Sequence, residues 1–535
     1  MIHSCLLSGM SPRPVQVEVE LTRGLPRTQL LGLPGPAVRE AADRAHVALA
    51  ASGFHLAPYR TTINLAPADE RKDGAGLDLA IALALLEAHG TLTVPESQRV
   101  LVAAGLALDG SLRGLRGCLA TLLGAFSAGF NRVLVAPQNE EEARMVPDLA
   151  IQAPADLRAA VAMMEISAET QTAGHARLSG TAGATSESHS QIYLQSRLQS
   201  VWPRPDPTSG GAGTKELPPT PDLAEVHGQP LAKRALEIAA AGGHNVLFCG
   251  PPGSGKTMLA ERLPGILPPM TDRQRLEAMA VHGLAGLAID GLAQGDPPCR
   301  QPHHSITRVG LVGGGRPIVP GEIALANHGV LFLDEFPEFH PQTLEALRQP
   351  LEDQQVTLHR VGLESQFATS FLLVAAMNPC PCGRYGHPTQ PCSCSPGARL
   401  RYRSRLSGPL LDRIDLYLNL PPTHPTFLRE GLPDESSAKV RTRVLAASAH
   451  QAVRANAACN ARLSPNELDQ TACIETVART LLEENVDHLG LTARGYHRTL
   501  RVARTIADLE DSPTVTETHV AEALQYRDSQ CEPAL

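Results

Sequence analysis

The first part of the chain carries patterns of apolar residues typical of alternating strands and helices. Residues 15–21 (VQVEVEL) place apolar side chains at every second position, as a strand with one buried face does. Residues 35–52 carry Ala, Val and Leu at helical spacing with charges between them, which predicts an amphipathic helix. A strand, a buried helix and a later strand are predicted at residues 61–67, 77–90 and 132–137. We therefore expect one α/β domain over residues 1–166.

Hydrophobic periodicity is lost over residues 167–221, where Ser, Thr, Gly, Pro and Ala dominate. A segment of this composition cannot bury enough apolar surface to offset the entropy of ordering its backbone. We expect a flexible linker here, with one short helix near residues 192–199.

A second α/β pattern begins at Asp222. Residues 231–243 predict an amphipathic helix, and residues 245–250 (NVLFCG) predict a buried strand. We place this domain at residues 222–420. Residues 421–535 show three to five helical segments and no convincing strand, so we expect them to form a helical region.

Composition limits the classes of function. The chain of 535 residues allows about three or four domains, and its hydrophobic content of 43% supports packed cores. A net charge of −8 excludes a protein that coats nucleic acid by bulk charge, so a nucleic-acid site has to be a local patch or pore. Aromatic residues make up 3%, with Trp202 the single tryptophan, which disfavours base stacking. Signal-peptide features and stretches of about 20 apolar residues are absent, so we expect a cytoplasmic protein without a membrane partner.

Residues 250–257 (GPPGSGKT) match the P-loop pattern G-x-x-x-x-G-K-[ST] in full, between a predicted strand and a predicted helix. Glycines let backbone N–H groups turn toward phosphate oxygens at a helix N-terminus, whose dipole favours anions. We expect Lys256 to meet the β- and γ-phosphates of ATP and Thr257 to ligate Mg²⁺. The predicted nucleotide-binding residues are Gly250, Pro251, Pro252, Gly253, Ser254, Gly255, Lys256, Thr257 and Met258.

Further segments end in polar residues suited to nucleotide hydrolysis. The apolar run VLFL precedes Asp334, expected in the Mg²⁺ shell, and Glu335, expected to polarise the attacking water as general base. The run FLLVAAMNP presents Asn378 near the γ-phosphate, and SGPLLDRID presents Arg413, which could reach a neighbouring subunit's nucleotide as an arginine finger. The alternatives are solvated acids at a strand end and, for Arg413, a surface salt bridge.

Four of the eleven cysteines are grouped, as Cys380, Cys382, Cys392 and Cys394. Two close pairs of thiolates can complete a tetrahedral shell, which favours a structural Zn²⁺ site. His387, in the loop between the pairs, could compete as a ligand. The alternative is four reduced thiols in a loop rich in Pro and Gly.

Several segments together resemble the ComM/YifB family of magnesium-chelatase-like AAA+ ATPases. They are HNVLFCGPPGSGKTMLA, QPHHSI, LVGGG, PGEIALANHGVLFLDE, AAMNPCPCG and RYRSRLSGPLLDRIDL. The C-terminal LTARGYHRTLRVARTIADL and HVAEALQYR agree, as do the N-terminal GLPGPAVREAADRAHVAL and INLAPAD. The resemblance covers nearly the whole chain apart from the linker.

This resemblance implies an α/β protein with an N-terminal Lon-protease-like domain of the ribosomal S5 domain 2-like type, an AAA+ P-loop ATPase core and a C-terminal helical lid. It also implies a homo-hexameric ring in which Asn378 is sensor 1, Arg413 the arginine finger and Arg494 sensor 2. The implied activity is ATP-driven branch migration of DNA during natural transformation, with a recombinase as a candidate partner.

The Lon-like resemblance does not extend to protease chemistry. Residues 72–78 (KDGAGLD) stand where the Lon pattern has its nucleophile, and Gly76 occupies the serine position. Leu119 aligns with the catalytic lysine, and a Ser–Lys dyad needs both groups. Ser111 is the nearest unmatched hydroxyl. We expect a domain that keeps the fold without the chemistry, for assembly or DNA guidance.

Three segments are candidates for DNA contact. Arg399, Arg401, Arg403 and Arg405 alternate in RLRYRSRL; an extended segment would place all four on one face, and a helix would spread them. Residues 356–371 predict a hairpin that could enter a ring pore with His359 and Arg360. The third comprises His303, His304 and Ser305 with Arg316. Adjacent histidines should diverge and no carboxylate is nearby in sequence, which favours a pore or interface loop over a metal site.

Other functions remain open on the sequence alone. The ATPase motor of a magnesium chelatase would use the same core, although the Lon-like domain and the cysteines are not part of its usual design. An ATP-dependent protease is disfavoured by Gly76 and Leu119, and a non-enzymatic scaffold by the intact ATPase motifs. In the C-terminal helix that Thr492 caps, Arg498, Arg501 and Arg504 are expected to make salt bridges within the lid.

Overall fold

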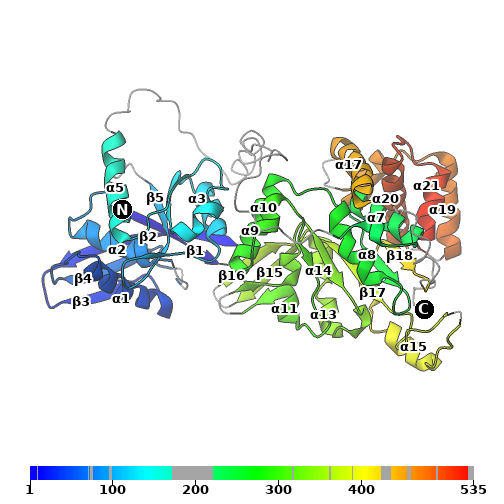
Figure 1. Ribbon diagram of the computed structural model, residues 1–535, viewed down its shortest axis with the longest axis horizontal. Coiled ribbons are helices and arrows are strands. Elements are labelled where there is room, and N and C mark those ends of the chain that lie inside the picture. Colours follow the sequence, from blue (N-terminus) through cyan, green and yellow to red (C-terminus); the bar gives the residue numbers. More distant parts are fainter. Residues whose placement is uncertain are drawn as a thin grey trace.

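The computed structural model describes residues 1–8, 10–69, 72, 76–94, 99–171, 221–315, 318–360, 363–387, 389–422, 435–454, 459–489 and 492–527. An N-terminal α/β region, a second α/β region and a set of C-terminal helices follow one another along the long axis of the molecule (Figure 1). None of the helices in these ranges is long and apolar enough to cross a bilayer.

A seven-stranded mixed sheet forms the centre of the N-terminal region, in the order β3-β4-β2-β1-β5-β8-β9. The strands β1, β5, β8 and β9 run parallel, and β2 pairs antiparallel with both β1 and β4. The alternation of residues 15–21 is explained by β2, in which Val15 and Val17 are buried. The strands are Ile2–Ser8, Ser11–Thr22, Arg27–Leu31, Arg60–Ala66, Val100–Ala103, Arg132–Val135 and Ala150–Gln152 (β1–β5, β8, β9).

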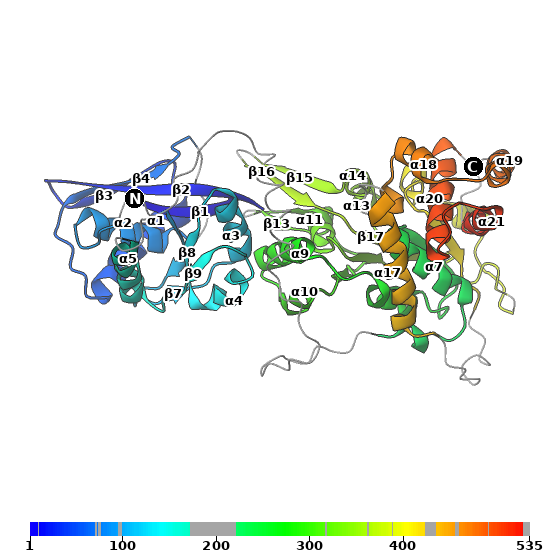
Figure 2. The same ribbon diagram turned by 90° about the horizontal axis from the view of Figure 1, so that it is seen from above.

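Helices cover both faces of this sheet. On one face lie α1 (Pro36–Ala51), α5 (Leu157–Gln171) and α2 (Asp78–Ala88), and α2 is buried nearly all round (Figure 2). On the other face lie α3 (Cys118–Ser127) and α4 (Glu140–Ala143). A two-stranded ribbon, Gly105–Leu106 with Leu112–Arg113 (β6, β7), precedes α3.

The predicted strands and helices of this region are confirmed, and α5 continues five residues past 166. Residues 172–220 of the predicted linker, including the short helix near 192–199, lie outside the described residues.

The second region is built on a five-stranded parallel sheet in the order β11-β14-β17-β10-β18. Its strands are Val246–Cys249 (β10), Cys299–Arg300 (β11), Val330–Leu333 (β14), Leu372–Met377 (β17) and Leu416–Asn419 (β18). Strands buried on both faces read as continuous apolar runs, which is why these segments lack alternation. Phe248 and Phe332 face one core, and Leu247 and Leu333 face the other.

The first core is shared with the helices that flank the sheet and with the C-terminal helices. The flanking helices on this side are Pro230–Gly242 (α7) and Lys256–Arg262 (α8). The second core lies under Arg308–Val312 (α11), Glu322–Leu325 (α12), Pro341–Glu345 (α13), Arg348–Asp353 (α14), Pro396–Arg403 (α15) and Gly408–Leu411 (α16). The sheet is therefore the middle layer of three.

Residues between α8 and β11 join the two α/β regions. Helix α9 (Asp272–Ala285), followed by α10 (Asp290–Gln294), packs against α3 in one apolar cluster. The amide of Gly117 donates a hydrogen bond of 3.2 Å to the carbonyl of Gly283 at this contact. Nothing in the local pattern of either helix predicted this pairing.

Two antiparallel ribbons extend from the second sheet. One is short, Gly313–Gly314 with Val319–Pro320 (β12, β13). The other is the predicted hairpin, confirmed as Gln355–Arg360 (β15) and Leu363–Ala368 (β16). Residues 361 and 362 of its tip lie outside the described residues.

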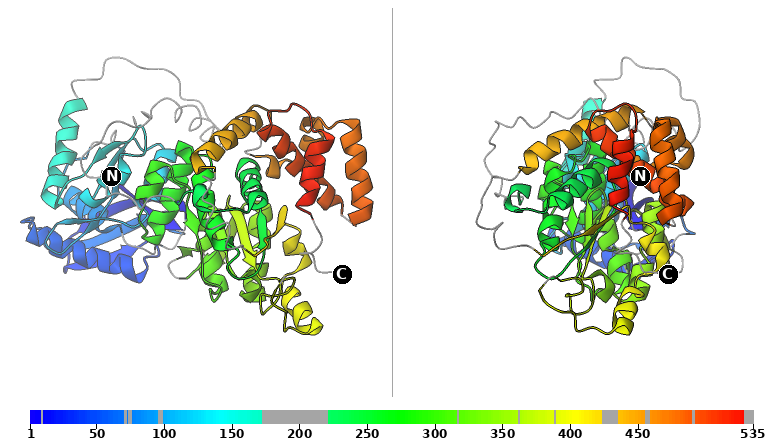
Figure 3. Two further views of the ribbon diagram at one scale, coloured as in Figure 1. Left: turned by 45° about the vertical axis from the view of Figure 1, so that its right-hand side comes forward. Right: turned by 90° about the vertical axis from the view of Figure 1, so that its right-hand side faces the viewer.

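The described part of residues 435–527 is helical, as predicted. Its α-helices are Ser437–Arg454 (α17), Pro465–Thr471 (α18), Thr476–Leu489 (α19), Ala493–Leu509 (α20) and Glu517–Gln525 (α21). Buried residues of α17, α20 and α21 belong to the same core as α7 and one face of the sheet. The helices thus lie beside the sheet at the end of the molecule away from the N-terminal region (Figure 3).

Candidate nucleotide site and arginine pocket

The P-loop connects β10 to α8 at the carboxyl edge of the parallel sheet. Gly253 and Gly255 adopt φ of 77° and 86°, a backbone region that favours glycine, and Gly255 caps α8. The Lys256 ammonium donates hydrogen bonds to the carbonyls of Gly250 (2.7 Å) and Pro251 (2.9 Å). Burial lowers the pKa of Lys256, and the charge of Asp334 opposes this shift.

Three predicted site residues meet at this edge, and one of them, Thr257, belongs to the P-loop itself. The Thr257 hydroxyl donates a 2.9 Å hydrogen bond to Asp334 Oδ2, at the end of β14. Asn378, at the end of β17, accepts a 3.3 Å hydrogen bond from the Lys256 ammonium through Oδ1. A hydroxyl and a carboxylate oxygen this close are hard oxygen ligands suited to Mg²⁺. The donor set therefore fits a magnesium nucleotide.

The fourth member of this edge, Glu335, contacts a residue that sequence reasoning missed as a site residue. Glu335 Oε2 lies 2.9 Å from His304 Nδ1, and Glu335 itself has φ of 52°. The expectation that adjacent histidines diverge is wrong, because the rings of His303 and His304 stack with centroids 4.1 Å apart. The carboxylate partner is distant in sequence, and the pairing of β11 with β14 brings it close. No local pattern could have indicated it.

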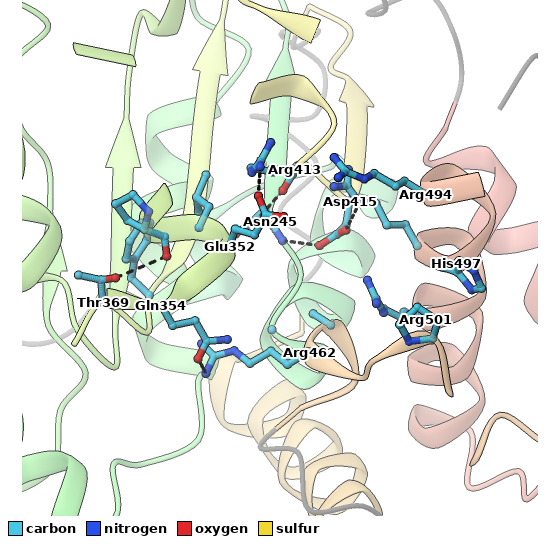
Figure 4. Close-up of a pocket in the computed structure, with 17 residues that line it drawn as sticks. Asn245, Glu352, Gln354, Thr369, Arg413, Asp415, Arg462, Arg494, His497 and Arg501 are labelled. Carbon is cyan, nitrogen blue, oxygen red and sulfur yellow. Dashed lines mark hydrogen bonds and ion pairs between the residues drawn. The ribbon is translucent and has the colours of Figure 1, made fainter. Parts of the chain in front are cut away.

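Arg413 and Arg494 lie at the opposite edge of the sheet, in a pocket of about 470 Å³ that we call the arginine pocket (Figure 4). Its lining includes Asn245, Phe371 and Asp415, which immediately precede β10, β17 and β18. Strands of four to six residues separate this edge from Lys256 by roughly 13–20 Å at about 3.3 Å per residue. The structure therefore brings Arg494 together with Arg413 and not with the P-loop of the same chain.

The arginine pocket holds more cationic than anionic groups. Five arginines and His497 line it, against the carboxylates of Glu352 and Asp415. The arginines are Arg413, Arg462, Arg494, Arg498 and Arg501. Burial raises the pKa of Asp415, but His244, whose Nδ1 lies 3.5 Å from Asp415 Oδ2, and the charge of Arg498 outweigh this and lower the pKa. Among the described residues, Arg413 Nε, Arg501 Nε and His497 Nδ1 are buried without a hydrogen-bond partner. This excess of positive charge fits an anionic ligand.

The four clustered cysteines meet in the loop after Asn378. Their sulfur atoms all lie within 4.8 Å of one another, with Cys380 Sγ 3.3 Å from Cys382 Sγ and 3.6 Å from Cys392 Sγ. A tetrahedral ZnS₄ shell requires about 3.8 Å between sulfurs. Hydrogen bonds from the backbone N–H groups of Arg384 and Ser393 lower the pKa of Cys382, which favours the thiolate that binds metal, while burial raises the pKa of Cys380.

The residues of this cluster therefore fit a Zn²⁺ ion, and His387 is not among them. His387 Nδ1 accepts hydrogen bonds from the backbone N–H groups of Thr389 (3.2 Å) and Gln390 (3.1 Å) instead. The four thiolates alone would complete the shell.

Three of the four alternating arginines after the cysteines lie on a helix, and Arg405 follows it in a turn. The helix α15 carries Arg399 and Arg403 over the ring of Tyr385, at 4.2 and 5.8 Å from its centroid. Arg405 pairs with Glu338 at 2.7 Å. The four cations are consequently spread, and α15 lies at the periphery of the second region (Figure 1).

The N-terminal region shows apolar surroundings at the positions aligned with the Lon dyad. Gly76 has φ of 123°, and a Cβ there would lie 3.0 Å from the Leu115 side chain. Leu119 is fully buried within the cluster that joins α3 to α9. The Ser111 hydroxyl donates a 2.7 Å hydrogen bond to Asp109. Residues 73–75 of the aligned segment lie outside the described residues.

The fold and this site define a P-loop protein of the magnesium-chelatase type. Three family models match: "Magnesium chelatase, subunit ChlI" at residues 222–427, "Subunit ChlI of Mg-chelatase" at residues 17–139, and "Magnesium chelatase, subunit ChlI C-terminal" at residues 434–527. The matches cover the second region, most of the N-terminal region and the C-terminal helices in turn.

Curated relatives match over nearly the whole chain. Protein YifB of Escherichia coli (strain K12) is 40% identical over 529 residues, covering 98% of this chain and 96% of its own length. Competence protein ComM of Haemophilus influenzae is 39% identical, with 98% and 97% covered. The DNA replication licensing factor Mcm2 of Drosophila melanogaster is 22% identical over 36% of this chain and 20% of its own length. The chain belongs to the ComM/YifB family of magnesium-chelatase-like proteins.

Proposed function

We propose that this protein is an ATP hydrolase that works as a homo-hexameric DNA translocase and promotes branch migration in recombination during natural transformation. The observation that carries the proposal is the separation of two complementary half-sites. Lys256, Thr257 and Asp334 lie at the carboxyl edge of the sheet, and Arg413 and Arg494 line the arginine pocket at the amino edge. In a ring, the carboxyl edge of the sheet in one subunit would face the amino edge of the sheet in the next, which would complete one site at each subunit interface.

The residues divide the chemistry between two subunits. Lys256 would bind the β- and γ-phosphates, and Thr257 and Asp334 would hold Mg²⁺, which neutralises phosphate charge when bound. Glu335 would accept the proton of the attacking water, and Asn378 would orient the γ-phosphate. Arg413 and Arg494 of the neighbour would stabilise the charge of the transition state.

Support for DNA as the substrate comes from relatives and from the distribution of charge. One relative is named as a competence protein, and a more distant one as a DNA replication licensing factor. The hairpin β15–β16 carries the exposed His359, and α15 carries the exposed Arg401. In a ring, a few such cations on an axial channel would bind the phosphate backbone without base readout.

Junction assays with purified protein test this function. We expect ATP turnover to rise on adding branched DNA, and labelled three- or four-strand junctions to be resolved with ATP. Binding should weaken steeply with salt and depend little on sequence. K256A is the matched negative control, since its P-loop cannot bind the phosphates. The proposal would be contradicted if DNA left the rate of ATP turnover unchanged and the labelled strands were not separated.

A second candidate is the ATPase motor of a magnesium chelatase. It is favoured by the description that all three matching family models share. Stimulation of ATP turnover by such a partner and porphyrin, in place of DNA, would favour this alternative.

The cysteine cluster is proposed as a structural Zn²⁺ site. Four thiolates close the coordination shell, which leaves no open position for catalysis. The N-terminal region is proposed to be proteolytically inactive, since Gly76 and Leu119 provide neither nucleophile nor base. Covalent labelling of this region by a serine-directed reagent would contradict that assignment.

A further inference from the structure

The base of the hairpin β15–β16 forms one wall of the arginine pocket. Glu352, at the end of α14, lines the pocket together with Gln354 and Thr369, which flank the two strands. The Thr369 amide donates a 2.8 Å hydrogen bond to the Gln354 carbonyl, which closes the hairpin at its base. Whatever occupies the pocket therefore lies beside the start and the end of the hairpin.

Arg462 fixes both ends of this hairpin to the C-terminal region. Its guanidinium donates a hydrogen bond to Gln354 Oε1 (3.0 Å), one residue before β15 (Figure 4). It donates a second one to Ser370 Oγ (2.6 Å), two residues after β16. Arg462 thus bridges two segments separated in sequence by the hairpin. A change in the pocket would be transmitted to both strands at once.

Glu352 is the internal counter-charge of Arg413. The Arg413 guanidinium pairs with the Glu352 carboxylate and also donates to the Pro409 carbonyl at 2.5 Å. The Arg413 side chain is 12% exposed and Glu352 is 56% exposed, so the arginine is held and the carboxylate is free to leave. A triphosphate that entered the pocket would compete with Glu352 for Arg413.

The hairpin also packs against the N-terminal region, through one residue near its base and one at its middle. Leu358 on β15 and Phe367 on β16 share an apolar cluster with Met10, in the turn between β1 and β2, and with Leu284 at the end of α9. The hairpin therefore spans from the arginine pocket at its base to the junction of the two α/β regions. A two-stranded ribbon held at both places can carry a displacement of its base to the other end.

We infer that Glu352 is a positioning residue that couples the neighbour's nucleotide in the arginine pocket to the hairpin. With no phosphate in the pocket, Glu352 holds Arg413 and fixes α14 and the hairpin base. When the ATP of a second copy enters the pocket, its phosphate replaces Glu352 as the partner of Arg413. The freed Glu352 no longer fixes the hairpin base, and the hairpin moves relative to the sheet. The inference rests on the proposed function, because it takes the nucleotide of a second subunit as the ligand and DNA as the substrate of the hairpin.

ATP turnover of the full-length chain with and without branched DNA tests this role, comparing E352Q with D353N. Asp353 is the adjacent exposed carboxylate on α14 and does not line the pocket, so D353N is matched in charge and position. Loss of the competing carboxylate should lower the KM for ATP about two- to fivefold in E352Q. The ratio of DNA-stimulated to basal turnover should fall toward one in E352Q and stay at the wild-type value in D353N.

Amide hydrogen exchange gives a second readout that does not depend on turnover. Addition of a non-hydrolysable ATP analogue to assembled wild type should change exchange in residues 355–368, and the change should be absent in E352Q. If E352Q and D353N showed the same stimulation by DNA and the same change in hydrogen exchange, this inference would be overturned and the proposed function would stand. Wild type that is not stimulated by DNA would instead overturn the proposed function on which it rests.

Discussion

At the residue scale, His304 shows how a site contact can be hidden from the sequence. The P-loop and the acidic pair are recognisable because the chemistry of each is contained in a few consecutive residues. The His304–Glu335 contact joins residues whose strands, β11 and β14, are neighbours only in the folded sheet. The sequence offers many carboxylates as partners for His304, and spacing along the chain does not single out Glu335.

We predict that His304 positions the general base. H304A should lower kcat for ATP about tenfold, part of the 10²–10⁴-fold that general-base catalysis supplies, and leave the KM for ATP within about twofold, because no phosphate contact is lost. H304N should restore most of the rate, since its amide can still donate to Glu335. Steady-state ATP turnover of both variants measures this.

The double variant H304A/E335Q controls for indirect effects. If His304 acts through Glu335, its loss should add nothing once Glu335 is replaced. Independent, multiplying losses would contradict the assignment.

At the element scale, the spacing of apolar residues predicted most strands and helices, because an element buried on one face or on both carries apolar residues at a regular spacing or in a continuous run. Helix α9 was missed as the contact of α3, because its apolar residues indicate burial but not the burying partner. The conformation of RLRYRSRL was also undecidable, since alternating arginines fit a strand and a helix equally. Helix α15 forms because Ser395 caps it, accepting a 3.2 Å hydrogen bond from the Ala398 amide.

The cysteine loop is predicted to support the P-loop through its metal. A Cβ on Gly383 would lie 2.6 Å from Pro252, so the loop that the thiolates close touches the phosphate-binding segment. We expect about one zinc per chain in the purified protein. C382S/C392S should lose the zinc and raise the KM for ATP several-fold, because Pro252 loses its support.

C473S is the matched control for this prediction, since Cys473 is exposed and lies outside the cluster. It should keep both the zinc and the wild-type KM. Metal analysis and ATP titration of the three proteins measure the effect, and wild type purified without zinc would contradict it.

Arg504 is predicted to stabilise the C-terminal helices. Its side chain is 2% exposed and bonds Asp508 at 2.8 Å and the carbonyls of Ala472 (3.2 Å) and Pro513 (3.0 Å). R504A would remove the donor to both carbonyls and to Asp508 Oδ1, while Asp508 keeps Arg454 and Asn460 as partners through Oδ2. We therefore expect a loss of about 2–4 kcal/mol in the free energy of unfolding. Denaturant unfolding followed by circular dichroism measures it, with the exposed R479A expected within about 0.5 kcal/mol of wild type.

At the scale of the whole molecule, the motifs predict the residues of an ATPase site but not how these residues would divide between subunits. Arg494 follows the P-loop in the same chain, and a side chain in the first turn of a helix could serve a nucleotide of either subunit. The folded sheet separates the two possibilities, because α20 lies beside the amino ends of β10, β17 and β18. Only the three-dimensional arrangement puts Arg494 beside Arg413.

This arrangement predicts that Arg413 and Arg494 are delivered to the nucleotide by the same neighbouring subunit. R413A and R494A should each abolish ATP turnover alone, as should E335Q. An equal mixture of E335Q with R413A should regain activity, since about one quarter of interfaces would pair an intact Glu335 with an intact Arg413. A mixture of E335Q with R494A should do the same.

The decisive mixture is R413A with R494A. If both arginines come from one subunit, no interface in this mixture receives the pair, and turnover stays at the background of the single variants. If Arg494 instead served the nucleotide of its own chain, about one quarter of interfaces would be complete and turnover would return. Measurements after subunit exchange, with the E335Q mixtures as proof that exchange occurs, therefore distinguish the arrangement seen in the arginine pocket from a lid that closes on its own P-loop.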